Sequence, residues 1–258
     1  MPSGSPPEAR AATSIFPSAL CRASRISRTS RRTGVGEGLT SWLKTAVENL
    51  AEDAVTVELL DIEGTNFPVV SGDDDDGDDH DHDHGYGKGD PHGWLDLENG
   101  KLWLAAIAET LSQVDPDNAV IYDANAHAAE AEIDFLVQQL EARLAPVQGR
   151  GHIVFHDAYG HFQAAFDLPG LGAISLSDAV RPSAARLSEL RDRVVSSEAV
   201  WVFSEPQFDT ALVETLVDGT PARSGVLDPL GSSLASGPTL YPMLLENLGN
   251  SLADCLTP

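Results

Sequence analysis

Residues 116–162 read PDNAVIYDANAHAAEAEIDFLVQQLEARLAPVQGRGHIVFHDAYGHF, a long helical pattern followed by a short apolar run. In the first part, apolar residues recur at the spacing of one helix face: Ile133, Leu136, Val137, Leu140 and Leu144. Pro116 suits the first helical position after an Asp115 N-cap, and Pro146 ends the pattern. A helix of about 30 residues spans on the order of 45 Å. The pattern therefore predicts a linking helix, within residues 115–147, that can act as a rigid backbone between two lobes.

After this helix, short apolar runs alternate with helical segments. The expected strands cover residues 152–155, 173–176, 199–203 and 225–227. The expected helices begin near residue 158 and then cover residues 183–195, about 210–217, and 240–255. Repeated strand–helix units predict an α/β lobe over residues 148–258, in which a mainly parallel sheet carries helices on both faces.

The pattern of apolar residues changes along the chain before the linking helix. Residues 39–50 have apolar side chains at helical spacing, residues 55–59 alternate as in a strand, and residues 97–115 again carry a helical stripe. The run GDDDDGDDHDHDHGYGKG (72–89) contains almost nothing that can be buried, which predicts an exposed loop. Residues 34–114 are therefore interpreted as the rest of an N-terminal lobe with this loop inserted.

The first 33 residues are rich in Ser, Arg and Pro and have no apolar run long enough for the core of a secretory signal. They carry six Arg and one Glu, so residues 34–258 hold a charge of −29 within the total of −24. Such an acidic body repels phosphate backbones, which disfavours a nucleic-acid partner. No apolar stretch reaches the roughly 18 to 20 residues of a membrane-spanning helix. We expect residues 1–33 to be a disordered or non-homologous arm.

Three polar residues directly follow apolar runs of the expected sheet: His156, Glu205 and Asp228. In open parallel sheets, ligands bind outside the carboxyl ends of the strands. A histidine and two carboxylates at one sheet edge can form a nitrogen-and-oxygen site for a divalent cation. The alternative is that His156 is exposed beside an Asp157 N-cap and that Glu205 and Asp228, each followed by proline, open turns. His152 and His161, which flank His156, are expected to face solvent.

The Asp/His run offers a second group of candidate ligands. His80, His82 and His84 alternate with aspartates, and imidazoles in a mobile acidic tract can capture Zn²⁺, Cu²⁺ or Ni²⁺ without a fixed geometry. A solvated acidic linker explains the run equally well. Both interpretations stay open from the residues alone.

Signatures of common enzyme classes are missing from the sequence. It contains no HExxH, GxSxG or P-loop motif, and no GxGxxG after an expected strand. A non-enzymatic role is therefore expected.

Several segments, in this order, resemble the periplasmic substrate-binding protein of high-affinity zinc ABC transporters: VGEGL (35–39), the Asp/His-rich loop, DPHGWLD (90–96), IYDANA (121–126), IVFHDAYGHF (153–162), FSEPQF (203–208), VLDPLG (226–231) and LYPMLLENLGNSL (240–252). The resemblance covers about residues 34–258. It implies two Rossmann-like α/β lobes with parallel sheets, joined by one long backbone helix, with a metal ion held between the lobes.

The resemblance also implies the residues of the metal site. His92 in DPHGW and His156 in FHDAY match metal-binding histidines, and Asp228 in LDPLG matches an acidic position lining the site. Related manganese binders tend to have a carboxylate where His156 stands, and imidazole favours zinc by ligand softness. The loop with His80, His82 and His84 resembles the mobile histidine-rich loop of the zinc proteins.

The function implied by the resemblance is capture of Zn²⁺ in the periplasm and its delivery to an ABC permease. Zinc is then the transported ligand, and the protein is expected to be a monomer. Two alternatives remain. One is a metal-dependent hydrolase that uses Glu205 as its general base. The other is an acidic metal buffer in which the Asp/His loop alone binds.

The sequence departs from the family's pattern in its first part. The family's first metal histidine lies in a segment like GASPH, whereas the nearest trace here, SGSPPEA (3–9), has proline at that place. The N-terminal lobe is therefore expected to be incomplete, with an uncovered edge on the strand near residues 55–60. The family also often pairs a cysteine in the last helix with one in the strand before EPQ, but Trp201 stands in that strand and leaves Cys255 without that partner.

Overall fold

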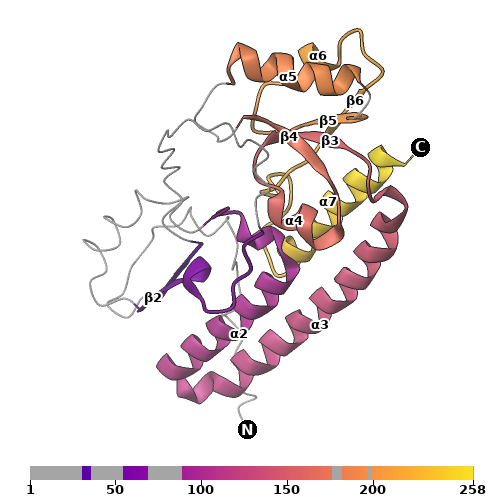
Figure 1. Ribbon diagram of the computed structural model, residues 1–258. Helices are drawn as coiled ribbons and strands as arrows, with labels where there is room; N and C mark the ends of the chain where they lie inside the picture. The colour runs from indigo at the N-terminus through magenta and orange to yellow at the C-terminus, as the bar shows by residue number, and fades with distance from the viewer. Residues whose placement is uncertain (1–30, 36–54, 69–88, 176–181, 197–198, 258) are drawn as a thin grey trace.

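The computed structural model describes residues 31–35, 55–68, 89–175, 182–196 and 199–257, and these residues form an α/β fold (Figure 1). The expected helix over 39–50 and almost all of the Asp/His-rich loop lie outside the described residues, as do residues 1–30. None of the described helices combines the length and the apolar character needed to span a membrane.

The main sheet has four parallel strands in the order β4-β3-β5-β6. These are β3 (His152–His156), β4 (Gly170–Ser175), β5 (Trp201–Ser204) and β6 (Arg223–Val226). Every residue of β3 is buried, as expected for a central parallel strand covered on both faces. The predicted parallel α/β arrangement is confirmed. Strand β4 begins three residues earlier than predicted, because Gly170 pairs with His152 through backbone groups and offers no apolar signal.

Helices cover both faces of this sheet (Figure 1). Helices α5 (Ala184–Val195) and α6 (Ala211–Val217) lie on one face, with α4 (Gly160–Phe166) and α7 (Leu240–Leu256) on the other. Side chains of β3 alternate between the two resulting cores, since successive residues of a strand point to opposite faces. Ile153 and Phe155 pack with α5 and α6, whereas Val154 packs in the larger core with α4 and α7.

The predicted long helix is present as α3 (Ala119–Leu144), with short 3-10 turns over Pro116–Asn118 and Ala145–Val147. Its 26 residues give a length of about 39 Å. The preceding helix α2 (Leu97–Val114) starts at an Asp96 N-cap, whose side chain accepts the backbone N–H groups of Glu98 and Asn99. In Figure 1, α3 lies alongside α2 and then continues to the main sheet, where it packs against α7.

Helix α7 also reaches the start of α2. A Cβ added at Gly100 would lie 2.4 Å from the Tyr241 hydroxyl, so only glycine allows the buried Tyr241 ring to approach α2 this closely. The start of α2, which follows directly on the DPHGW segment, is in this way anchored to the last helix of the chain.

Two further strands form a separate small parallel sheet. Strand β1 (Arg31–Gly34) pairs with β2 (Val55–Glu58). β1 begins inside the segment 1–33 that was expected to be an arm, so its last three residues belong to a strand. It also covers one edge of the strand that was expected to be open. The sequence did not reveal β1 because a parallel ladder is built from backbone hydrogen bonds, which need no apolar alternation in Arg-Arg-Thr-Gly.

His152, expected to face solvent, is instead fully buried on β3. Its Nδ1 lies 3.4 Å from the Arg150 carbonyl oxygen, and the Gln163 side-chain amide donates to its Nε2 at 3.1 Å. Burial disfavours the imidazolium form and lowers the pKa of His152 to about 4. The burial was not predicted, because His152 is the first residue of the strand and follows polar residues in the sequence.

We predict that His152 makes the fold weaker in mild acid. Because its folded-state pKa is about 4 and its ordinary value is 6.5, the unfolded chain binds the proton more readily. The contribution of neutral His152 to the free energy of unfolding is complete above about pH 6.5 and is lost as the pH falls toward 4. At pH 4.5 the loss is about 2 to 3 kcal/mol. Urea unfolding at pH 7.5 and 4.5 should show this loss, and His152→Gln should lack it. An equal pH dependence in both proteins would contradict the prediction.

Candidate metal centre

His92 is held in a tight turn just before α2. The Asp90 carboxylate accepts the backbone N–H of His92 at 2.9 Å, and the same oxygen lies 2.6 Å from His92 Nδ1. An aspartate that bonds the backbone two residues ahead forms an Asx-turn, and Pro91 between them restricts the backbone further. His92 is only 9% exposed. The turn therefore fixes both the backbone and the ring of this histidine.

His156 is the last residue of β3, and its ring is fixed by a residue that follows the neighbouring strand. Glu205 comes directly after β5, and its Oε1 lies 2.6 Å from His156 Nδ1. The backbone N–H of His156 also points to this oxygen, at 3.4 Å. Because β3 and β5 are parallel neighbours, their carboxyl ends meet at one edge of the sheet. Both side chains are almost completely buried.

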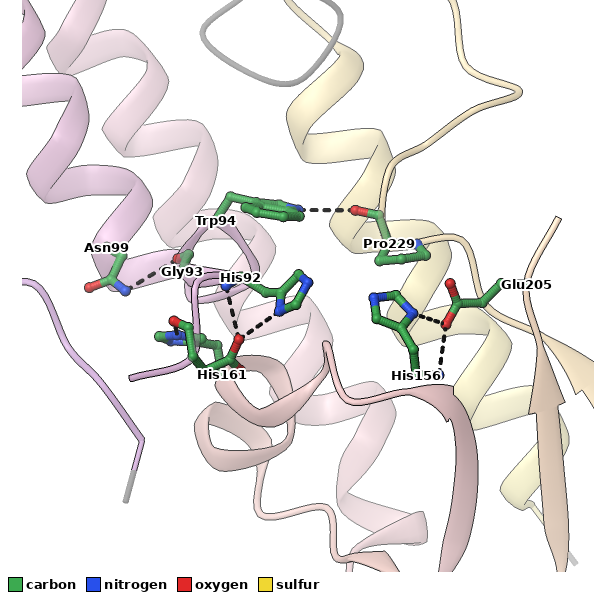
Figure 2. A network of polar contacts seen from close by, with 9 residues as sticks. His92, Gly93, Trp94, Asn99, His156, His161, Glu205 and Pro229 are labelled. Carbon is green, nitrogen blue, oxygen red and sulfur yellow. Dashed lines mark hydrogen bonds and ion pairs between the residues drawn. The ribbon is translucent and has the colours of Figure 1, made fainter. Parts of the chain in front are cut away.

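The two histidine rings face one another. Their centroids are 5.3 Å apart and their planes are inclined by 68°. Each Nδ1 lies against a carboxylate, which accepts only, so we infer that each Nδ1 carries the ring proton and each Nε2 keeps a lone pair. Figure 2 shows the second nitrogens of His92 and His156 directed toward each other. A carboxylate behind each imidazole is the arrangement that orients histidine ligands in metal sites.

Trp94 connects the His92 segment to the C-terminal part of the chain. Its indole N–H donates to the Pro229 carbonyl at 3.0 Å, and Figure 2 shows this bond beside the two rings. The Asn99 side-chain amide donates to the Gly93 carbonyl at 3.2 Å, which fixes the same turn from α2. The buried Trp94 ring also contacts the His92 ring, with centroids 5.2 Å apart. The mutual position of the histidines thus depends on contacts distant in sequence.

The Asp228 carboxylate organises the loop after β6. One oxygen accepts from the Gln207 amide and the Leu230 backbone, and the other from the backbone and hydroxyl of Ser232. Partial burial acts to raise the pKa of Asp228, but these hydrogen bonds outweigh it and hold the pKa below its ordinary value. Asp228 is therefore ionised at neutral pH.

The structure brings two of the three main candidates together. His92 and His156 face each other, whereas the Asp228 carboxylate is engaged in its own turn, beside the Pro229 that bonds Trp94. Within the described residues, no group of three or more His, Cys, Asp or Glu side chains has the spacing of a metal site. His80, His82 and His84 lie outside the residues that the structure describes.

Two carboxylates have roles that the sequence did not reveal. Glu205 was a candidate ligand or general base, but it supports His156 and is only 2% exposed, so it is poorly placed to activate a water molecule for hydrolysis. Asp90 was not singled out, although an aspartate two residues before a candidate ligand is itself a signal for an Asx-turn. Asp157 adds a further acidic group here, and desolvation and repulsion from Asp90 raise its pKa.

The family model described as "ZnuA: Zinc-uptake complex component A periplasmic" matches residues 24–255. A high-affinity zinc uptake system protein ZnuA from Brucella suis biovar 1 is 49% identical over 168 residues, which are 65% of this chain and 50% of that protein. The protein of the same description from Paracoccus denitrificans is 43% identical over 244 residues, covering 86% of this chain and 75% of that protein. The chain spans about half the length of the Brucella relative.

A solved structure shares the fold. The crystal structure of a 138–173 deletion mutant of ZnuA with zinc bound superposes with a TM-score of 0.70 at 25% identity, covering 88% of this chain and 78% of that one. The likeness takes in nearly nine tenths of the chain.

We predict that Glu205→Gln weakens Zn²⁺ binding about 10-fold to 100-fold, the usual effect of changing a carboxylate behind a histidine ligand. The amide can still accept from Nδ1, but it no longer raises the basicity of the His156 ring. Competition against a chelating dye measures the affinity, and circular dichroism checks the fold. Glu132→Gln, on the exposed side of α3, serves as the matched control. An unchanged affinity in folded Glu205→Gln would remove Glu205 from the centre.

Proposed function

The chain belongs to the ZnuA family of periplasmic zinc-uptake components, and from this membership we propose that it binds Zn²⁺ and passes it to an ABC permease for high-affinity zinc uptake. The observation that carries the proposal is the facing pair His92 and His156, each backed by a carboxylate at 2.6 Å. Imidazole nitrogen is a preferred zinc ligand, and the second nitrogens of the pair are directed toward each other (Figure 2).

Asp228 is proposed as a third ligand. An ionised carboxylate suits a dication, and the Asp228 loop is tied to the His92 segment by the bond from Trp94 to Pro229. A carboxylate has about four acceptor positions, and the structure uses all four. Coordination of zinc would therefore replace one existing bond. The exposed Gln207 amide is the partner most easily replaced by the metal, because water can satisfy it instead.

We place the metal between two lobes. The C-terminal lobe supplies His156 and Asp228 from the edge of the main sheet, and the segment before α2 supplies His92 from the other side. Helix α3 is the proposed rigid connection, and β1 with β2 belongs to the N-terminal lobe. In this arrangement both lobes contribute donors, so metal binding depends on their relative position.

The Asp/His loop is proposed as an accessory device that gathers metal through His80, His82 and His84. Its dense negative charge raises the local concentration of cations, and neutral imidazoles bind them reversibly. A periplasmic location, a permease partner and a monomeric state are proposed from the family. The metal-buffer alternative assigns all binding to this loop, and a deletion separates the two.

We predict one tight zinc site that depends on His156 and not on the Asp/His loop. In calorimetric titration, His156→Ala should lose the tight site, whereas a variant lacking residues 73–84 should keep it and lose only weak binding. His127→Ala, at an exposed position on α3, should match the unaltered protein.

The opposite pattern, with tight binding lost on deletion and kept in His156→Ala, would establish the metal buffer instead. Thermal unfolding without metal checks that each variant folds. His156 ends a strand and lies at the sheet edge, so its truncation should leave the cores intact.

A further inference from the structure

His161 lies close to the metal centre but belongs to neither the ligand pair nor its carboxylate supports. It stands in the first turn of α4 and is 1% exposed, although it was expected to face solvent. Its Nε2 lies 3.0 Å from the carbonyl oxygen of Asp90, a residue 71 positions earlier in the chain. Figure 2 shows His161 beside the turn that carries His92.

The bond to Asp90 defines the protonation of His161. A carbonyl oxygen only accepts, so Nε2 carries a proton, and in the neutral ring Nδ1 is then an acceptor. Within the described part of the chain, Nδ1 has no hydrogen-bond partner and is buried. A buried acceptor without a partner is unfavourable, and phenylalanine would pack against Phe67 in the same place without that penalty. What phenylalanine lacks is the N–H group that reaches Asp90.

Asp90 connects this bond to the metal centre. Its carboxylate holds the backbone and ring of His92, while its carbonyl is held by His161. Gly160 lets α4 approach the same residue closely, because a Cβ there would lie 3.0 Å from Asp90 Oδ2. His161 follows His156 by only five residues, so one short segment supplies both a ligand and the anchor for the turn of the other ligand.

We propose that His161 is a positioning residue of the metal centre. Its Nε2–H fixes the Asp90 carbonyl, and Asp90 in turn orients His92 toward His156. The proposal rests on the proposed function in taking His92 as a zinc ligand. It assigns His161 no contact with the metal.

Two substitutions separate the hydrogen bond from the shape of the side chain. His161→Phe keeps an aromatic ring but removes the donor, and His161→Gln keeps an N–H group at about the reach of Nε2. Zinc affinity is measured by chelator competition, with the exposed His127→Phe as control. We expect His161→Phe to bind zinc at least about 10-fold more weakly, as for other supports of metal ligands, and His161→Gln to recover most of that loss.

A second measurement does not use metal. The His92 backbone N–H is bonded to Asp90, so its hydrogen exchange in metal-free protein should be faster in His161→Phe and near the original rate in His161→Gln. This readout tests the connection from His161 through Asp90 to His92 without metal, so a failure of this connection can be told apart from a failure of the proposed zinc binding.

Unchanged exchange and unchanged affinity in His161→Phe would overturn the proposal. So would equal weakening in the Phe and Gln variants, since that would show a role in shape alone. If His161→Phe does not fold, His161→Leu, which also lacks the donor, provides the same comparison.

Discussion

Strands β3 and β5 lie side by side and run in the same direction, and the candidate metal centre depends on this pairing. It places the residue at the end of one strand next to the residue that follows the other, so His156 meets the Glu205 carboxylate without any special loop. The burial of β3 under helices on both faces keeps the strand ends from shifting. The other histidine comes from a separate segment and must be brought to this edge by long-range contacts.

The electrostatics of the centre suit a dication. Two carboxylates, Asp90 and Glu205, stand behind the two rings, each against an Nδ1, so that the lone pair of each ring lies on Nε2. These buried carboxylates would offset part of the charge of a cation held between the two rings. The acidic character of the whole chain, with a net charge of −24, acts in the same direction at longer range.

The parts of the structure that follow from local pattern were predictable from the sequence, and those that depend on distant contacts were not. Helix α3 was predicted from its periodic apolar residues and strand β3 from its apolar run. That His92 and His156 lie close together was predicted through the family resemblance. The burial of His161 was missed because it is decided by Asp90, 71 residues away. Strand β1 was missed because its pairing is a backbone property. Coordination of a metal ion by Asp228 competes with the hydrogen bonds that its carboxylate accepts. The balance between the two cannot be predicted from a sequence pattern.

The bond between the Trp94 indole and the Pro229 carbonyl joins residues 135 apart, and this separation has a consequence for the life of the newly made chain. Closing so long a loop carries an entropic penalty that is repaid only once the intervening strands and helices have packed. The anchor of the His92 turn on the C-terminal loop is therefore acquired late in folding, after synthesis has passed residue 229. Until then this bond does not hold the His92 turn to the C-terminal part of the chain. A nascent chain that ends before residue 229 therefore lacks this anchor, and the arrangement of the two histidines is completed only near the end of synthesis.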